Sequence, residues 1–288
     1  MKEGKVLLVG RPNVGKSTFV NNLIGQKVAI TSPKPQTTRF PIKAVYEDKR
    51  GRIIFVDTPG IIGKAEDYLS RKINEQTLKV LHENVDLVIY MVDHTRKRDF
   101  EEARVLGLVR KINKPKILVI NKIDSQEQTF LPQYEFLRDE FQDVFKISAV
   151  NNMHMKPLLD KIFEYIHERE ISELPPDLKY PLINIDSNIF IAELIREKVF
   201  LMMGEEIPYT STVVVDEIIE RHDKLTYIKA RILTTDDRYK KMIIGSGGRK
   251  IKEIGSYARK EIALAISKKI YLDLKVETNP HWQEVYYN

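Results

Sequence analysis

The sequence predicts an α/β domain with a mostly parallel sheet, followed by a smaller α+β domain. Over residues 1–170, short apolar runs rich in Val, Ile and Leu alternate with amphipathic helical patterns, as in parallel strands that helices cover on both faces. Pro175 and Pro176 then interrupt this alternation, because neither suits a helix interior. Beyond them the order becomes helix, two strands, helices and strand. We therefore predict a first domain at 1–170, a linker at 171–180 and a second domain at 181–288.

Six apolar runs predict the strands of the first domain. The short turn DKRG joins the second run to the third, which predicts an antiparallel hairpin at one edge of the sheet. Amphipathic patterns predict helices at 17–25, 101–112 and 158–170. The predicted strands lie at 5–10, 42–47, 52–57, 86–93, 116–122 and 144–148.

Composition excludes several classes of protein and of site. The chain has no cysteine, which excludes disulfides, thiolate metal sites and a cysteine nucleophile. The N-terminus enters an apolar strand without a signal-peptide pattern, and no apolar run approaches the roughly 20 residues that span a bilayer. We therefore expect a cytoplasmic protein. The net charge is +6, and residues 238–260 hold eight basic residues against Glu253 alone, so nucleic acid or an acidic membrane surface are candidate partners.

The segment GRPNVGKS matches the phosphate-binding loop pattern between a predicted strand and a predicted helix. Its glycines let the backbone wrap phosphates, while successive N–H groups and the helix N-terminus supply positive potential. Lys16 is expected to reach the outer phosphates, and the Ser17 hydroxyl to ligate Mg²⁺. A plain glycine-rich turn is the alternative, which the strand–loop–helix context disfavours. The candidate nucleotide-binding residues here are Gly10, Arg11, Pro12, Asn13, Val14, Gly15, Lys16, Ser17 and Thr18.

A second motif, DTPG, ends the third predicted strand. The Asp57 carboxylate can reach Mg²⁺ through water from this position. Gly60 can bring its backbone N–H close to a γ-phosphate, because it has no Cβ in the way. The next residue, where several nucleotide-hydrolysing proteins carry a water-orienting glutamine, is Ile61 here. The candidate residues of this motif are Asp57, Thr58, Pro59, Gly60 and Ile61.

Two further motifs predict selectivity for guanine. In NKID, the Asp124 carboxylate can accept hydrogen bonds from guanine N1–H and from its exocyclic amino group. Adenine has neither donor, so a buried carboxylate would be left unpaired against it. The segment SAV offers the Ala149 N–H to guanine O6, which adenine lacks. A plain surface loop after a strand is the alternative reading of NKID. The candidate guanine-binding residues are Asn121, Lys122, Asp124, Ser148, Ala149 and Val150.

The four motifs occur in the order typical of translation-factor-like GTPases, over about 170 residues. Together with PQTTRF at 35–40 and a second domain, they resemble the Era family of bacterial GTPases, which act in assembly of the small ribosomal subunit. The resemblance implies that Thr38 ligates Mg²⁺ in the GTP state, beside Ser17 and Asp57. It also implies that an apolar residue replaces the glutamine, as Ile61 does here. The implied catalytic residues are Asn13, Lys16, Thr38 and Gly60.

A potassium ion is a further hypothesis for the catalytic site. Some members of the wider group hold K⁺ with the asparagine of the phosphate loop, here Asn13. Such an ion would neutralise charge that develops between the β- and γ-phosphates. We hypothesise that Asn13 and the loop 32–37 hold it and that turnover is slow, with a partner as activator. Bracing of the loop by Asn13 is the alternative.

The second domain is predicted to hold a helix at 188–203, strands at 210–219, 226–235 and 269–277, and a GxxG segment between two helical runs. This arrangement resembles a type II KH domain, whose GxxG loop clamps the backbone of single-stranded RNA. The middle positions lack the basic residue common in KH loops, so phosphate contact is expected from the basic residues that follow. Ile243, Ile244, Ile251 and Ile254 are predicted core residues, with base contact as the alternative and Ile244, beside the glycines, as a candidate for the groove. Trp282 is predicted to belong to a packed tail. The candidate RNA-binding residues are Ile244, Gly245, Ser246, Gly247, Gly248, Arg249, Lys250 and Lys252.

The resemblance implies a two-domain switch. GTP and Mg²⁺ would order the loops around Thr38 and Gly60, and hydrolysis to GDP would release them. The implied partners are the 3′ end of small-subunit ribosomal RNA, the pre-ribosomal small subunit and, peripherally, the inner membrane; we expect a monomer. Two alternatives stay open: a GTP-sensing RNA scaffold that barely hydrolyses, and a P-loop kinase, which the guanine-reading motifs disfavour.

Overall fold

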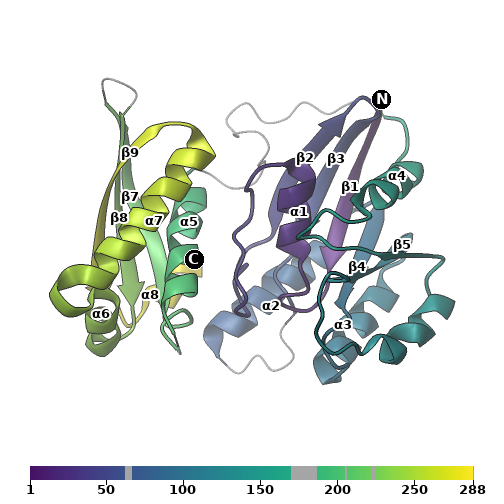
Figure 1. The fold of residues 1–288 in the computed structure, drawn as a ribbon, viewed down its shortest axis with the longest axis horizontal. Helices are drawn as coiled ribbons and strands as arrows, with labels where there is room; N and C mark the ends of the chain where they lie inside the picture. The colour runs from purple at the N-terminus through teal and green to yellow at the C-terminus, as the bar shows by residue number, and fades with distance from the viewer. Residues whose placement is uncertain (62–66, 170–186, 205, 222–224, 288) are drawn as a thin grey trace. The chain divides into compact units, whose positions relative to one another are not determined.

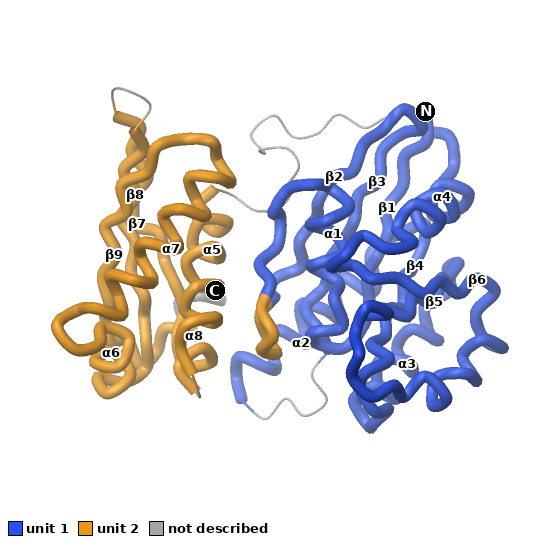
Figure 2. The backbone as a smooth tube through the Cα atoms, viewed as in Figure 1, with its two compact units in different colours: residues 1–31, 38–184 blue, residues 32–37, 185–288 orange. Residues whose placement is uncertain are grey.

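The computed structural model describes residues 1–61, 67–169, 187–204, 206–221 and 225–287 (Figure 1). Its contacts divide the chain into two compact units (Figure 2). Unit 1 holds residues 1–31 and 38–184, and unit 2 holds residues 32–37 and 185–288.

Unit 1 is built on a six-stranded sheet in the order β2-β3-β1-β4-β5-β6 (Figure 1). The β2–β3 pair is antiparallel and every other pair of this sheet is parallel. The predicted α/β class, with one antiparallel edge strand, is therefore confirmed. The strands are β1 (Lys2–Val9), β2 (Ile42–Asp48), β3 (Gly51–Asp57), β4 (Leu87–Asp93), β5 (Lys116–Asn121) and β6 (Asp143–Lys146).

Helices cover both faces of this sheet, which explains why the strands are apolar throughout rather than alternating. On one face, Leu7 and Tyr90 belong to a core cluster with Val80 of α2 and Val105 of α3. On the other face, Phe55 meets Phe19 of α1 edge-on, with 5.8 Å between the ring centroids. The helices are α1 (Lys16–Ile24), α2 (Tyr68–Leu81), α3 (Phe100–Lys111) and α4 (Met155–Tyr165), with a 3₁₀ helix at Leu131–Asp139.

The topology places the four motifs at the C-terminal ends of the parallel strands. Parallel strands end on the same side, so the loops that follow β1, β3, β5 and β6 converge there. The register shows this directly: Leu8 pairs with Asp57, and Asp93 pairs with Asn121. Motifs that lie far apart in the sequence are thereby brought into one site.

Unit 2 contains a three-stranded sheet in the order β7-β8-β9. The strands β7 (Ser211–Glu220) and β8 (Leu225–Thr234) are antiparallel, and β8 is parallel to β9 (Lys269–Thr278). Two helices connect the parallel pair, as the predicted type II KH arrangement requires. The helices are α5 (Ser187–Met202), α6 (Asp237–Ile244), α7 (Arg249–Ile266) and α8 (Trp282–Tyr287).

Trp282 is the largest fully buried side chain of the described residues. Its Nε1–H donates to the backbone carbonyl of Thr210 at 3.1 Å, which satisfies the one polar group of the indole. The last helix is thus attached to the loop before β7, and the prediction of a packed tail is confirmed.

The predicted linker, 171–180, lies outside the described residues, so the borders at 170 and 181 stay a prediction. One short segment is grouped differently from the prediction: residues 32–37, expected in the first domain, belong to unit 2 by their contacts. Within unit 2, Lys34 Nζ donates to the carbonyls of Phe200 and Met203, and Arg196 Nη2 to that of Thr37. The described helices include none with the length and apolar character needed to cross a membrane.

Candidate functional site

The phosphate loop lies between the end of β1 and the start of α1. Asn13 and Gly15 have φ values of 64° and 102°, in the left-handed region. A Cβ on Gly15 would lie 2.2 Å from Asn121 Nδ2, so only glycine fits there. Left-handed residues between right-handed ones turn successive N–H groups into an anion-binding nest. The loop geometry therefore agrees with the predicted phosphate role.

Lys16, the first residue of α1, is buried, with 5% of its surface exposed. Its Nζ donates to the carbonyls of Gly10 and Arg11, at 3.1 and 3.0 Å. Burial lowers the pKa of Lys16 to about 8, and the charge of Asp57 opposes this shift. Neutral carbonyls are weaker acceptors than phosphate oxygens. A bound phosphate would therefore raise the pKa of this lysine again.

The three predicted metal ligands come together beside Lys16. Ser17 Oγ donates to Asp57 Oδ2 at 2.6 Å and lies 3.1 Å from Thr38 Oγ1. Asp57 is fully buried, and its Oδ1 has no hydrogen-bond partner among the described residues. Burial raises the pKa of Asp57 to about 6, against the effects of Lys16 and Ser17. One carboxylate and two hydroxyls make a hard oxygen donor set, which fits Mg²⁺.

The DTPG turn packs directly on the phosphate loop. A Cβ on Gly60 would lie 2.3 Å from the backbone nitrogen of Pro12, so the close approach of the two loops requires glycine. Thr58 holds the turn through a hydrogen bond from its Oγ1 to the carbonyl of Leu8, at 2.7 Å. Ile61 is 2% exposed and belongs to the core cluster. Its side chain points into the core, so Ile61 can serve the site only through its backbone.

Asn121 links the NKID and SAV motifs to the phosphate loop. Its Nδ2 donates to the carbonyl of Val14 at 2.8 Å, and its Oδ1 accepts from the N–H of Ala149 at 2.9 Å. The Ala149 N–H, expected to face guanine O6, is therefore engaged by Asn121 in this structure. Lys122 Nζ forms an ion pair with buried Asp93, with 2.6 Å between Nζ and Oδ2.

Asp124 is exposed, which differs from the buried carboxylate assumed above. An exposed carboxylate is hydrated, so it discriminates against adenine only once a bound base covers it. Ser148 is buried and its Oγ accepts from the N–H of Asn151 at 3.1 Å, whereas the side chain of Val150 is 60% exposed. Of these residues, Asp124 and Val150 thus offer side chains to a ligand.

The GxxG segment of unit 2 forms the junction of α6 and α7. Gly245, Gly247 and Gly248 all have positive φ, at 71°, 59° and 74°. A Cβ on Gly245 would lie 2.7 Å from Cβ of Lys250, whereas Gly247 and Gly248 have open space at that position. Open glycine backbone allows a phosphate to approach the peptide groups. The glycines thus join two helices, as predicted, and leave open space at Gly247 and Gly248.

A cavity of about 350 Å³ runs between α7 and β9. It combines apolar side chains, which suit bases, with the cations Lys252 and Arg259, which suit phosphates. Of the predicted RNA-binding residues, Lys252 lines this cavity. Arg259, two turns further along α7, was not among the predicted residues, although its spacing of seven residues from Lys252 indicates the same helix face. The lining residues are Ile251, Lys252, Gly255, Ser256, Arg259, Leu272 and Leu274.

The isoleucines around the GxxG loop divide into two groups. Ile243 and Ile254 are fully buried, so their prediction as core residues is confirmed. Ile251 was predicted as core, but it is half-buried and lines the cavity. Ile244 is half-buried beside the loop. Lys250 Nζ lies 3.3 Å from Glu253 Oε2, so part of its charge is neutralised within the helix.

Comparison with known proteins agrees with both units. The family model for the 50S ribosome-binding GTPase matches residues 5–122, and the model for the KH domain matches residues 206–283. GTPase Era of Halothermothrix orenii is 39% identical over 285 residues, which cover 98% of this chain and 95% of that protein. GTPase Era of Thermotoga maritima is 37% identical over 291 residues, which cover 99% of this chain and 94% of that protein.

A solved structure resembles the whole chain. The crystal structure of Era in complex with MgGDPNP and nucleotides 1506–1542 of 16S ribosomal RNA has a TM-score of 0.90 and 34% sequence identity. The match covers 100% of this chain and 97% of that one. With the relatives above, it shows the family on sequence and on structure. The chain belongs to the Era family of GTPases.

Proposed function

We propose that this chain hydrolyses GTP with Mg²⁺ and binds single-stranded RNA, the 3′ end of small-subunit ribosomal RNA, during assembly of that subunit. The observation that carries the nucleotide half is the convergence of Ser17, Thr38 and Asp57 beside Lys16. A buried carboxylate oxygen without a hydrogen-bond partner is costly unless a ligand compensates it. A metal ion between this carboxylate and a triphosphate supplies that compensation.

The residues of the site would act together on the triphosphate. Ser17, Thr38 and Asp57 would hold Mg²⁺, which neutralises charge on the outer phosphates when bound. Lys16 would donate to the same oxygens from the phosphate loop, and Gly60 would offer its N–H from the opposite side. Because the Ile61 side chain lies in the core, backbone groups would orient the attacking water. Without a side-chain water ligand, we expect slow turnover.

We further propose that Asn13 takes part in holding a K⁺ ion near the β- and γ-phosphates. Asn13 has a left-handed backbone, with φ at 64°, which is uncommon for a residue other than glycine and is often found at functional sites. This conformation supports a functional role for Asn13. Single-turnover hydrolysis in K⁺ and in Na⁺ at equal ionic strength tests the ion. Equal rates in the two salts would leave Asn13 with only a bracing role.

The RNA half of the proposal is supported by the cavity beside α7 and by the open glycines at 247 and 248. A related Era protein was crystallised with nucleotides 1506–1542 of 16S ribosomal RNA, which suggests the ribosomal 3′ end as ligand. The basic net charge of +6 is compatible with RNA and with peripheral contact with the inner membrane. We infer that the chain acts in the cytoplasm as a monomer.

The substitution Asp124→Asn tests guanine selectivity. Xanthine carries an oxygen where guanine carries its amino group, so an amide at position 124 should pair with xanthosine triphosphate. We expect the variant to lose preference for GTP and gain it for xanthosine triphosphate in competition binding. Unchanged preference would remove the assignment of Asp124 as the base reader.

A further inference from the structure

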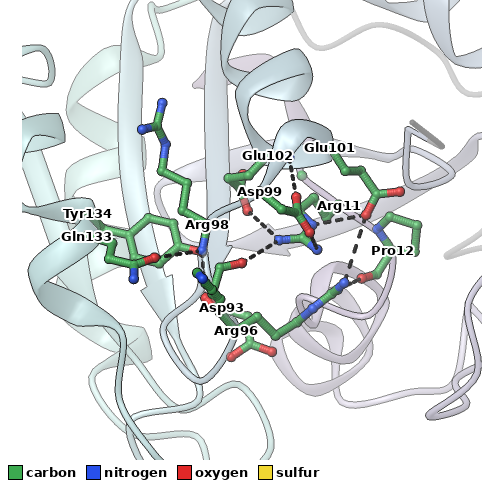
Figure 3. A network of polar contacts seen from close by, with 12 residues as sticks. Arg11, Pro12, Asp93, Arg96, Arg98, Asp99, Glu101, Glu102, Gln133 and Tyr134 are labelled. Atoms are coloured by element: carbon green, nitrogen blue, oxygen red, sulfur yellow. Dashed lines mark hydrogen bonds and ion pairs between the residues drawn. The ribbon is translucent and has the colours of Figure 1, made fainter. Parts of the chain in front are cut away.

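The side chain of Arg11, the second residue of the phosphate loop, contacts residues 97–101. It is 3% exposed and reaches the turn before α3 (Figure 3). There Arg11 Nε donates to Glu101 Oε2 at 3.0 Å, and Arg11 Nη2 to Asp99 Oδ2 at 2.7 Å. Arg11 Nη1 donates to the carbonyl of Lys97 at 3.3 Å. Three of its nitrogens are thus occupied by a single short segment of unit 1.

A third carboxylate connects this cluster to the sheet. Glu102 Oε2 lies 3.6 Å from Arg11 Nη1, and Glu102 is almost fully buried. Tyr90 of β4 donates from its hydroxyl to Glu102 Oε1. Burial raises the pKa of Glu102, while the hydrogen bond from Tyr90 and the charge of Arg11 oppose the shift. The partners of Arg11 therefore rest on the core of the domain rather than on a free loop.

The neighbouring residue, Pro12, is held from two sides. Arg96 Nη1 donates to the carbonyl of Pro12 at 2.8 Å (Figure 3). On the other side, the backbone of Gly60 approaches Pro12 so closely that a Cβ there would lie 2.3 Å from its nitrogen. Arg11 and Pro12 are consequently fixed between the segment 96–102 and the DTPG turn.

The same residues connect to the phosphate-binding lysine. The carbonyl of Arg11 accepts from Lys16 Nζ at 3.0 Å. Directly after Pro12, the backbone enters the left-handed conformations of Asn13 and Gly15. Such conformations persist only where the surroundings over-determine them. The anchor of Arg11 is therefore adjacent, in the chain and through Lys16, to the part of the loop that would contact phosphate.

We propose that Arg11 is a positioning residue that holds the phosphate loop in its binding conformation before a nucleotide arrives. This inference rests on the proposed nucleotide site. A loop ordered in advance loses less freedom on binding, so its ligand is held more tightly. The phosphates that the loop contacts are common to GDP and GTP. Loss of the anchor should therefore weaken the binding of both nucleotides, and mainly through faster dissociation.

The test compares dissociation of fluorescent GDP and GTP analogues from the full chain by stopped flow. In Arg11→Gln we expect both nucleotides to leave about tenfold faster or more, and in Arg11→Lys an intermediate rate, because lysine keeps the charge but not the planar fork. Arg110→Gln is the matched control: Arg110 pairs with Glu140 at the other end of α3, at 2.5 Å. It should dissociate nucleotide at the wild-type rate.

A double-mutant cycle separates positioning from a role in the fold alone. Glu101→Gln should speed dissociation by itself but add little in the Arg11→Gln background, because the two act through one contact. The melting temperature of the nucleotide-free variants is measured in parallel. A lower melting temperature with wild-type dissociation rates would overturn the proposal. If Arg11→Gln does not fold, Glu101→Gln and Arg96→Gln carry the test, and wild-type rates in both would overturn it. Failure of the wild-type chain to bind either nucleotide would instead reject the proposed site.

Discussion

Ser17 and Asp57, which are 40 residues apart in the sequence, are joined by a hydrogen bond of 2.6 Å from Ser17 Oγ to Asp57 Oδ2. The bond exists because β1 and β3 are parallel neighbours, so the loops that follow their C-terminal ends lie side by side. It brings a hydroxyl and a buried carboxylate together where the proposed Mg²⁺ would bind. The other oxygen of Asp57, Oδ1, is left without a hydrogen-bond partner among the described residues.

The first prediction follows from this pair. Asp57→Asn keeps the shape of the side chain but removes its charge, so the proposed Mg²⁺ site would lose the one charged ligand assigned to it. We expect the apparent Mg²⁺ affinity of the GTP-bound protein to fall by about tenfold or more, with GDP binding less affected. Titration of Mg²⁺ in a single-turnover GTPase assay measures it. The matched control is Asp67→Asn, which removes a carboxylate from the N-cap of α2 instead. Equal Mg²⁺ dependence in Asp57→Asn and wild type would contradict the assigned ligand.

The second prediction concerns pH. Burial raises the pKa of Asp57 from 3.8 to about 6, so its proton must leave before Mg²⁺ binds. The apparent Mg²⁺ affinity should be constant above pH 6 and fall by about tenfold per pH unit below it. For the metal-free protein the sign is opposite. A raised carboxyl pKa stabilises the fold below pH 3.8, and this contribution is lost as the pH rises through 6.

Asp57→Asn isolates this titration from that of other carboxyl groups. Denaturant unfolding in EDTA, between pH 4.5 and 7, should show wild type losing stability relative to the variant as the pH rises. Parallel pH profiles of the two proteins would mean that Asp57 titrates normally in the fold.

The third prediction concerns the position after the DTPG motif. Ile61 lies in the core cluster, so Ile61→Gln buries an amide and should destabilise the fold by about 2–4 kcal/mol. Ile61→Val, the control, should cost about 1 kcal/mol. Neither substitution should speed GTP hydrolysis, because the side chain points away from the phosphates. A faster Ile61→Gln enzyme with wild-type stability in urea would show that the glutamine reaches the attacking water.

Much of the nucleotide site could be predicted from the sequence because each motif follows a strand. The periodicity of the apolar residues predicts where each strand ends. The parallel pairing of β1 and β3 then brings Ser17 and Asp57 together. The direction in which a side chain points is harder to predict from the sequence. Arg11 was predicted to bind nucleotide, yet its carboxylate partners come some 90 residues later in a segment without a motif. Its burial follows from tertiary packing alone.

The cavity between α7 and β9 shows the same limit. The GxxG loop is visible in the sequence because its three glycines, at 245, 247 and 248, stand close together, and all three have positive φ in the structure. The opposite wall of the cavity is formed by Leu272 and Leu274, which in the sequence resemble any half-buried strand. Only the parallel pairing of β8 with β9 decides that these leucines lie beside α7. A similar limit applies to residues 32–37, because no local pattern in the sequence indicates that they belong to unit 2.

The last prediction tests the GxxG loop in the full chain. Gly247 has φ at 59° and open space where a Cβ would stand, and aspartate tolerates left-handed backbone, so Gly247→Asp should fold. Its carboxylate would face the RNA backbone and repel it. We expect affinity for a single-stranded RNA of the ribosomal 3′ end to fall by roughly tenfold to a hundredfold, with wild-type GTP binding. Gly107→Asp on α3, which changes the net charge equally and also meets open space, should bind RNA as wild type does. Filter binding across a salt series measures both variants. Equal losses of RNA affinity in the two would mean that the change in net charge, and not a phosphate clamp at the GxxG loop, causes the loss.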